Sequence, residues 1–242
     1  MPKLSSMLKS ESPSYVTTLP IDKRKITYRP FRVKEEKILL MALEEETEEA
    51  ILRALLTIIE NCCEEIDNAG ELLSVDIEHL FIQLRSKSIG EVVEPIITCP
   101  YTGETFQHKI DLSDIKLEKK EKKLSNKINI SDTMGVTLKL PCMNTLLNNK
   151  FNNKLSELGI EDSVKVVSLC IEEIWNEKEI IKGDNTTIEE RIDFIENLPP
   201  DVFSKIIDYF DNSPSLTYTL KYKTKDKTER EITLSGLDDF FG

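Results

Sequence analysis

The chain has 242 residues, 31% of them charged, and a formal net charge of −12 at pH 7. This length accommodates one large hydrophobic core or two small ones. With 39% hydrophobic residues the composition is that of a folded, soluble protein. The acidic balance argues against a dedicated nucleic-acid-binding protein, whose phosphate-facing surface is normally basic.

The sequence shows no sign of secretion or membrane insertion. No window approaches about 18 uncharged apolar residues, and residues 1–14 lack the apolar core and cleavage site of a signal peptide. Five cysteines, an odd number, fit reduced thiols better than a disulfide framework. We therefore expect a protein that stays inside the cell that makes it and has no membrane partner.

The first half of the chain alternates between strand-like and helix-like patterns. Residues 1–14 are expected to be flexible, and period-two runs predict a hairpin over 15–29 that ends at Pro30. Helical spacing then predicts helices over 33–45, 48–66 and 77–87, the third capped by Asp76. The first of these helices takes its apolar positions from Ile38, Leu39, Met41, Ala42 and Leu43.

A second hairpin is predicted after these helices. Residues 92–99 are rich in β-branched side chains, 100–103 have turn chemistry, and 105–110 alternate like a returning strand. A polar stretch of mixed charge, residues 118–126, then reads as a linker.

The second half repeats this order. We predict a hairpin over 127–140 and a final hairpin over 215–234, with helices between them over 144–158, 164–175, 187–196 and 201–210. The fold class expected is α+β, with small antiparallel sheets packed on helices and an internal duplication. The expected parts are a flexible segment 1–14, a domain 15–117, the linker 118–126 and a domain 127–242.

Catalytic or metal chemistry is not indicated. His79 and His108 are the only histidines, and both lie in patterns typical of packed side chains. Cys99 and the following Pro100 look like half of a zinc knuckle, but Thr102 stands where a second cysteine would be needed for a four-ligand site. We therefore expect no enzyme activity, no metal and no cofactor.

Two large aromatic residues, Phe240 and Phe241, follow Leu237 and precede the last residue, Gly242. A tail this short forms no core of its own. Either the rings pack back on the final hairpin or they insert into a partner as aromatic anchors.

Several motifs resemble those of one family. The run 28–31, the run 33–37, the pattern of residues 84–91 and the Cys99-Pro100 pair look like the T4-type phage baseplate proteins of the hub assembly class. The similarity is clear over residues 15–115 and looser afterwards, although the ending at 236–241 is also similar. Relatives with a Cys-Pro-x-Cys turn would have a second cysteine at Thr102, and the resemblance brings no catalytic residues.

The resemblance implies an assembly factor or chaperone for the hub of a contractile-tail baseplate. Its partners would be baseplate hub and tape-measure proteins, without nucleic acid, and its place the host cytoplasm during virion assembly or the virion tail baseplate. Oligomeric state is not predicted. The partner-binding candidates are Arg29, Phe31, Arg85, Lys87, Gly90, Glu91, Leu237, Phe240 and Phe241.

Two other interpretations stay open. The chain would equally suit a permanent structural subunit of the baseplate hub, whose hairpins pair with neighbouring subunits. An enzyme acting on nucleic acid or cell wall is the third, but the sequence offers no convergent carboxylate or histidine group for it. A nucleic-acid-binding patch at 119–123 would be interrupted by Glu121.

Overall fold

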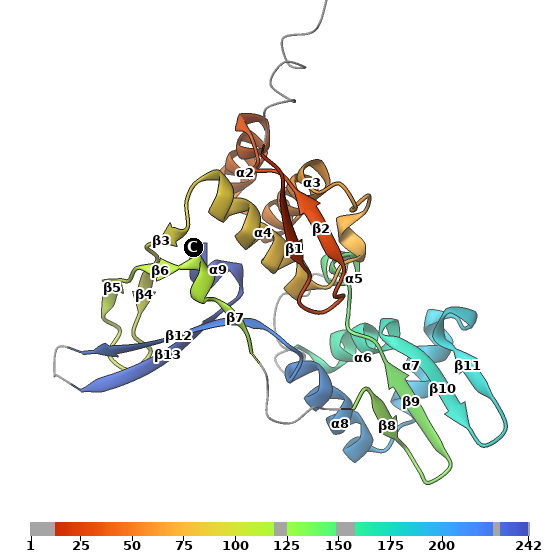
Figure 1. The fold of residues 1–242 in the computed structure, drawn as a ribbon. Helices are drawn as coiled ribbons and strands as arrows, with labels where there is room; N and C mark the ends of the chain where they lie inside the picture. The colour runs from red at the N-terminus through yellow and green to blue at the C-terminus, as the bar shows by residue number, and fades with distance from the viewer. Residues whose placement is uncertain (1–12, 119–124, 149–157, 225–227, 242) are drawn as a thin grey trace, which may run out of the picture. The chain divides into compact units, whose positions relative to one another are not determined.

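The computed structural model describes residues 13–118, 125–148, 158–224 and 228–241 (Figure 1). The expectations for residues 1–12, for the charged run 119–124 and for the part of a helix at 149–157 lie outside this set. The chain divides into two compact units, one made of Met1–Glu118 with Pro214–Gly242 and the other of Lys119–Ser213.

Helices and small antiparallel sheets make up both units, which confirms the predicted α+β class. The first unit contains β1 (Tyr15–Thr18), β2 (Lys25–Tyr28), α2 (Val33–Glu45), α3 (Glu48–Cys62), α4 (Ser74–Ser88), β3 (Val92–Val93), β4 (Ile96–Thr98), β5 (Thr105–Gln107), β6 (Ile110–Asp111), β7 (Lys116–Leu117), β12 (Leu216–Lys223), β13 (Glu229–Ser235) and α9 (Gly236–Phe241). The second contains β8 (Lys127–Asn129), β9 (Met134–Leu138), α5 (Met143–Asn148), α6 (Ile160–Leu169), β10 (Ile171–Asn176), β11 (Ile180–Lys182), α7 (Ile188–Glu196) and α8 (Pro200–Asp211).

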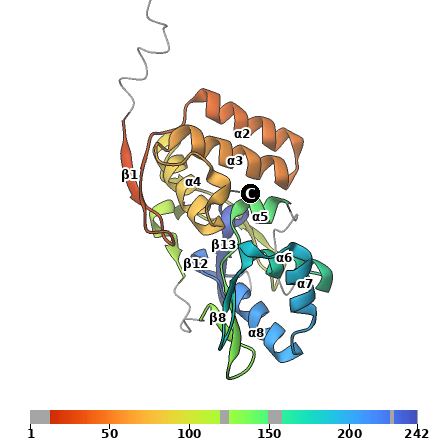
Figure 2. The ribbon, with the colours of Figure 1, turned by 90° about the vertical axis from the view of Figure 1, so that its right-hand side faces the viewer.

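The hairpin predicted after α4 forms as two short strand pairs. β4 pairs with β5, and β3 pairs with β6, in each case antiparallel. The helices α2 and α3 lie side by side in the same unit (Figure 2). One hydrophobic cluster joins these early elements to the end of the chain, and its buried members are Val75, Ile82, Val93, Ile97, Ile110, Leu112, Leu216, Leu220, Leu234 and Phe240.

The final hairpin belongs to the first unit, although we expected it to close a second domain of residues 127–242. β12 pairs with β7 in the register Leu216↔Leu117 and with β13 from Thr217 to Lys223. Its inward residues Leu216 and Leu220 enter the cluster defined above. Among the described residues the second unit therefore has no closing hairpin of its own, and the predicted internal duplication is not shown.

The second unit is built on a sheet of order β11-β10-β9-β8, in which all neighbours are antiparallel. We expected one helix over 164–175, but α6 ends at Leu169 and residues 171–176 form the strand β10. Pairing with β9 overrides the helical apolar pattern there. At Gly135 of β9 a Cβ atom would lie 2.3 Å from the Trp175 ring, so only glycine fits beneath that indole.

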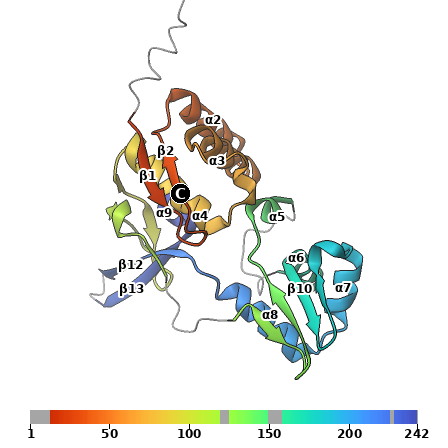
Figure 3. The same ribbon diagram turned by 45° about the vertical axis from the view of Figure 1, so that its right-hand side comes forward.

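We expected Asp76 to cap the third helix, but it lies inside that helix and does not cap it. Leu73 is the N-cap of α4, and the fully buried Asp76 carboxylate accepts hydrogen bonds from the backbone N–H groups of Ile21 at 2.9 Å and Asp22 at 3.2 Å. Burial raises the pKa of Asp76, and these two hydrogen bonds oppose the rise. The carboxylate therefore fixes the turn of the β1–β2 hairpin, which Figure 3 shows beside α4.

Candidate protein-interaction surface

The motif at residues 84–91 forms the end of α4 and the turn into β3, which we call the α4 exit. Gly90 has a φ of 151°, a conformation that favours glycine. Arg85 Nη1 donates to the carbonyl oxygens of Gly90 at 2.5 Å and Val92 at 3.3 Å. Burial lowers the pKa of Arg85. The guanidinium thus holds the exit in one conformation.

Two further contacts tie the α4 exit to its surroundings. Lys87 Nζ lies 2.6 Å from a Glu91 carboxylate oxygen and 5.8 Å from the centre of the Tyr15 ring. The hydroxyl of Ser88 accepts a hydrogen bond from the backbone N–H of Phe31 at 2.9 Å. Phe31 itself is only 9% exposed. These candidate residues therefore already have partners within the chain.

The C-terminal aromatic residues fold back on the same unit. Phe240 is 1% exposed within the hydrophobic cluster, and Leu237 packs against that cluster. The Phe241 ring meets the ring of Phe81 edge to face, with centroids 5.5 Å apart, and lies 5.7 Å from Arg85 Cζ. Of the two alternatives for the tail, this structure has the rings packed on the chain itself, and Phe240 has no surface left for a partner.

Arg29 forms a separate constellation at the start of α2. Its guanidinium donates to a Glu35 carboxylate oxygen at 3.0 Å and to the Asn61 carbonyl at 2.8 Å. Glu35 is fully buried and also accepts from the Arg32 backbone N–H and from Lys34. Burial alone would raise the pKa of Glu35, but the hydrogen bonds from Arg29, Lys34 and Arg32 outweigh it and lower the pKa.

The structure brings Arg85, Gly90 and Phe241 together, and it keeps Arg29 apart with Glu35. It also exposes apolar residues that the sequence analysis did not select. Ile89 is 58% exposed, Val92 49% and Ile96 65%. Residues 92–99 alternate strictly between exposed and buried, so the β-branched run itself signalled that half of its side chains face outward.

The Cys99 turn is built from hydrogen bonds to sulfur. The Tyr222 hydroxyl donates to Cys99 Sγ at 3.0 Å. Burial would raise the pKa of the thiol, but hydrogen bonds from the Thr102 and Tyr222 side chains and from the turn backbone lower it to about 7. The same bond to Cys99, with burial, raises the pKa of Tyr222 to about 12. Cys99 is 1% exposed, so this turn serves packing.

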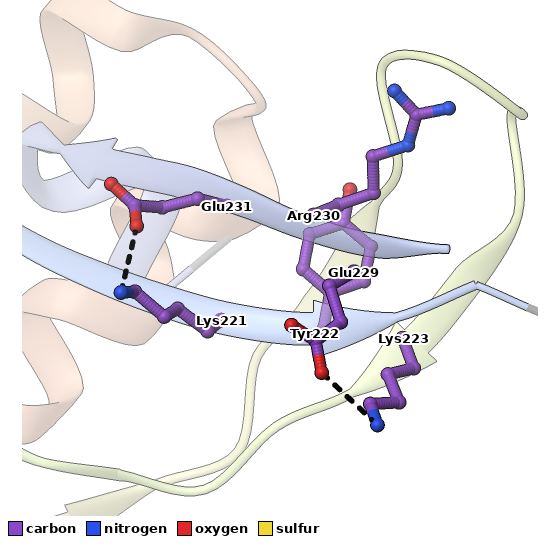
Figure 4. Close-up of a pocket in the computed structure, with 6 residues that line it drawn as sticks. All are labelled: Lys221, Tyr222, Lys223, Glu229, Arg230 and Glu231. Atoms are coloured by element: carbon purple, nitrogen blue, oxygen red, sulfur yellow. Dashed lines mark ion pairs between the residues drawn. The ribbon is translucent and has the colours of Figure 1, made fainter. Parts of the chain in front are cut away.

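A shallow depression lies on the final hairpin, lined by both of its strands (Figure 4). Across it Lys221 pairs with Glu231 at 3.5 Å and Lys223 with Glu229 at 3.1 Å. The guanidinium of Arg230 stacks on the Tyr101 ring, with Cζ 4.4 Å from its centre. Charges here are matched across the strands, as in an ordinary solvated hairpin.

Within the described parts of the chain, no group of three or more His, Cys, Asp or Glu residues is placed to hold a metal ion. A membrane-crossing helix is also absent from these parts, since none is both long and apolar enough. His79 bonds to the Thr17 hydroxyl at 2.8 Å and His108 to the Tyr218 hydroxyl at 3.2 Å. The two histidines thus lie in separate packing contacts.

Fold and surface together define an α+β protein of two compact units, whose first unit carries exposed apolar side chains beside a tightly bonded turn. Comparison with known protein families identifies the family to which the chain belongs. Residues 12–242 match the family described as T4 bacteriophage base plate protein, and the chain belongs to this family. No curated protein and no solved structure matches the chain. The resemblance to baseplate proteins is thereby confirmed.

Proposed function

We propose that this baseplate-family chain acts without catalysis as an assembly factor of the baseplate hub, binding hub or tape-measure proteins in the host cytoplasm. The observation that carries the proposal is the α4 exit. Its backbone is held by Arg85, and Ile89 on it is exposed, as are Val92 in β3 and Ile96 in β4 just beyond it. A turn already fixed by hydrogen bonds loses less conformational freedom when its apolar neighbours bind a partner, which favours protein recognition.

Strand edges add to this proposal. β1 and β2 form a two-stranded sheet, as do β3 and β6, and β4 and β5. Each strand of such a pair has an outer edge where backbone groups can pair with another chain, although the edge of β2 is partly taken by Glu64, whose N–H donates to the Thr27 carbonyl oxygen at 3.0 Å. The acidic net charge suits a protein that stays soluble while it holds an aggregation-prone partner.

The test is co-expression of the tagged full-length chain with the hub and tape-measure proteins of its phage, followed by a pull-down. The variant Ile89→Ser/Val92→Ser/Ile96→Ser is expected to lose at least nine-tenths of the retained partner. The matched control Ile160→Ser/Ile180→Ser changes two side chains that are 66% and 64% exposed in the second unit. If both variants retained the partner equally, the exposed residues at and beside the α4 exit would not be its binding site, and they would no longer support the proposed function.

The alternative is a permanent structural subunit of the hub, which the same surfaces would serve. Mass spectrometry of purified particles separates the two roles. A chain present in fixed ratio to the other baseplate proteins is a subunit, and a chain absent from particles but required for their formation is an assembly factor.

A further inference from the structure

The outer side of α2 carries apolar residues that the described chain does not cover. Six consecutive apolar residues, 38–43, occupy the middle of this helix. Ala42 is buried, whereas Leu40 is 54%, Met41 58% and Leu43 49% exposed. Apolar residues all round a helix are typical of one that is packed on more than one side.

The helix is prevented from rotating to bury these side chains. Glu35, the third residue of α2, is fully buried and receives the Arg29 guanidinium on the inner side. Its other carboxylate oxygen accepts a hydrogen bond from the backbone N–H of Arg32, the N-cap residue, at 2.9 Å. Turning Leu40 inward would bring the Glu35 carboxylate out of these bonds, so the apolar residues stay outward.

The spacing on the outer side is that of a helix-packing seam. Leu40 lies seven residues after Val33, and Leu43 lies three residues after Leu40. This is the spacing of an a position, the next a position and the following d position in a coiled coil. Val33 is 79% exposed. Glu36 occupies the d position between Val33 and Leu40. We call Val33, Glu36, Leu40 and Leu43 the α2 seam.

Charge decides what fits the seam. Glu44 and Glu45 end α2, Glu46 follows, and the last turn contains no basic residue. Because a helix C-terminus carries partial negative charge, these carboxylates add to an unfavourable potential there. In the part of the chain that the structure covers, no ion pair involves Glu36, Glu44, Glu45 or Glu46. A cationic partner would reduce the negative potential at the helix end and form ion pairs with these carboxylates.

We propose that the α2 seam is the docking site for a basic amphipathic helix of a partner protein, whose apolar stripe packs on Val33, Leu40 and Leu43. Lysine or arginine residues beside that stripe would face Glu36 and the carboxylates at the helix end. The inference rests on the proposed function for the existence of a protein partner, and it adds the chemistry of the segment recognised.

A second copy of this chain fits the seam poorly. In a parallel pair of α2 helices Glu36 would face Glu36 of the other copy, and in an antiparallel pair it would face Leu40. Either arrangement places a carboxylate against another carboxylate or an apolar side chain in the middle of the seam. The net charge of −12 also opposes self-association.

The test uses a labelled synthetic helical peptide with leucine at a and d positions and lysine at e and g, titrated against the full chain by fluorescence anisotropy. Saturable binding is expected, at least tenfold weaker for Leu40→Ser/Leu43→Ser. The control Ile180→Ser should bind like the wild type. A matched peptide with glutamate in place of lysine should bind at least tenfold more weakly.

The charge-reversal variant Glu36→Lys/Glu44→Lys sharpens the test. It should bind the lysine peptide at least tenfold more weakly than the wild type and reverse the preference toward the glutamate peptide. The proposal is overturned if Leu40→Ser/Leu43→Ser or Glu36→Lys/Glu44→Lys binds the lysine peptide as tightly as the wild type does. It is also overturned if the wild type binds the lysine and glutamate peptides equally. A dimer, seen by analytical ultracentrifugation, that Leu40→Ser/Leu43→Ser abolishes overturns it as well.

Failure of this inference and failure of the proposed function give different results. If the peptide test fails while the pull-down retains hub or tape-measure proteins, the assembly role stands and the α2 seam is not its site. If the peptide behaves as expected but no baseplate protein is retained, the seam binds basic helices and the assembly role falls.

Discussion

The C-terminal helix α9 and the outer side of α2 show two different outcomes for apolar residues. For Phe240 and Phe241 the sequence allowed either packing on the chain or insertion into a partner, and Phe240 is 1% exposed in the core of the first unit. Met41 and Leu43 look like core positions of a helix, yet they are 58% and 49% exposed. Apolar character therefore shows that a side chain needs a contact, and only its neighbours decide whether the chain itself supplies it.

The largest effect that would sharpen this comparison is expected at Phe240. Phe240→Ala should lower the free energy of unfolding by about 3 to 5 kcal/mol, because it leaves a cavity in a packed cluster. Urea denaturation of the full chain measures it. A decrease in the free energy of unfolding below about 1 kcal/mol would mean that the Phe240 ring is not part of the core. Phe240 would then again be a candidate for binding a partner. For the same reason a truncation at Gly236 is expected to unfold the first unit.

Glu35 sets which side of α2 faces inward, and Glu35→Gln should cost about 2 kcal/mol through its weakened charged hydrogen bonds. The lowered pKa of Glu35 means that its ionised form stabilises the folded state. This contribution is complete above the ordinary pKa of 4.5 and is lost as the pH falls through the folded-state pKa. The difference in stability between wild type and variant should accordingly shrink below pH 4.5. A constant difference in urea titrations across that range would contradict the ion pair.

Arg85 joins the α4 exit to α9, and Arg85→Met should cost about 1 to 2 kcal/mol by leaving the Gly90 and Val92 carbonyls without their donor. Methionine keeps much of the apolar stem. Hydrogen exchange should show faster exchange at the Val93 amide beside this turn. Unchanged exchange there, with unchanged stability, would show that the exit is held by other contacts and that its rigidity does not depend on Arg85.

The smallest effect is expected on the outer side of α2. Leu40→Ser should change the free energy of unfolding by no more than about 0.5 kcal/mol, since the side chain has little contact to lose. Thermal unfolding of the monomeric chain measures it against Phe240→Ala. A loss above about 2 kcal/mol would show that Leu40 is covered in solution, and the contrast between the two regions would collapse.

The pKa values of the cysteines also depend on neighbours that the local sequence does not show. All five are free in the structure. Burial raises the pKa of Cys62 to about 11 and of Cys63 to about 12, whereas Cys99, also buried, has a pKa of about 7 because hydrogen bonds reach its sulfur. Nothing in the sequence near Cys99 reveals Tyr222, which lies 123 residues away.

Sequence pattern alone determined the local elements. The hairpins at both ends of the chain, the helices α2, α3, α7 and α8, and the Pro200 start of α8 follow from period, caps and proline geometry, which act within a few residues. The motifs at 28–31, 33–37 and 84–91, with the Cys99-Pro100 pair, predicted the baseplate family, which the match over residues 12–242 confirmed.

Tertiary structure decided the rest, because long-range pairing carries no local signal. It turned residues 171–176 into a strand by pairing them with β9, and it moved the final hairpin into the first unit through Leu216 and Leu220. It placed the Arg85 guanidinium where it donates a hydrogen bond to the Gly90 carbonyl oxygen at the α4 exit. Packing of α2 on α3, together with the buried Glu35 carboxylate that fixes the rotation of α2, determined that Leu40 and Leu43 face outward.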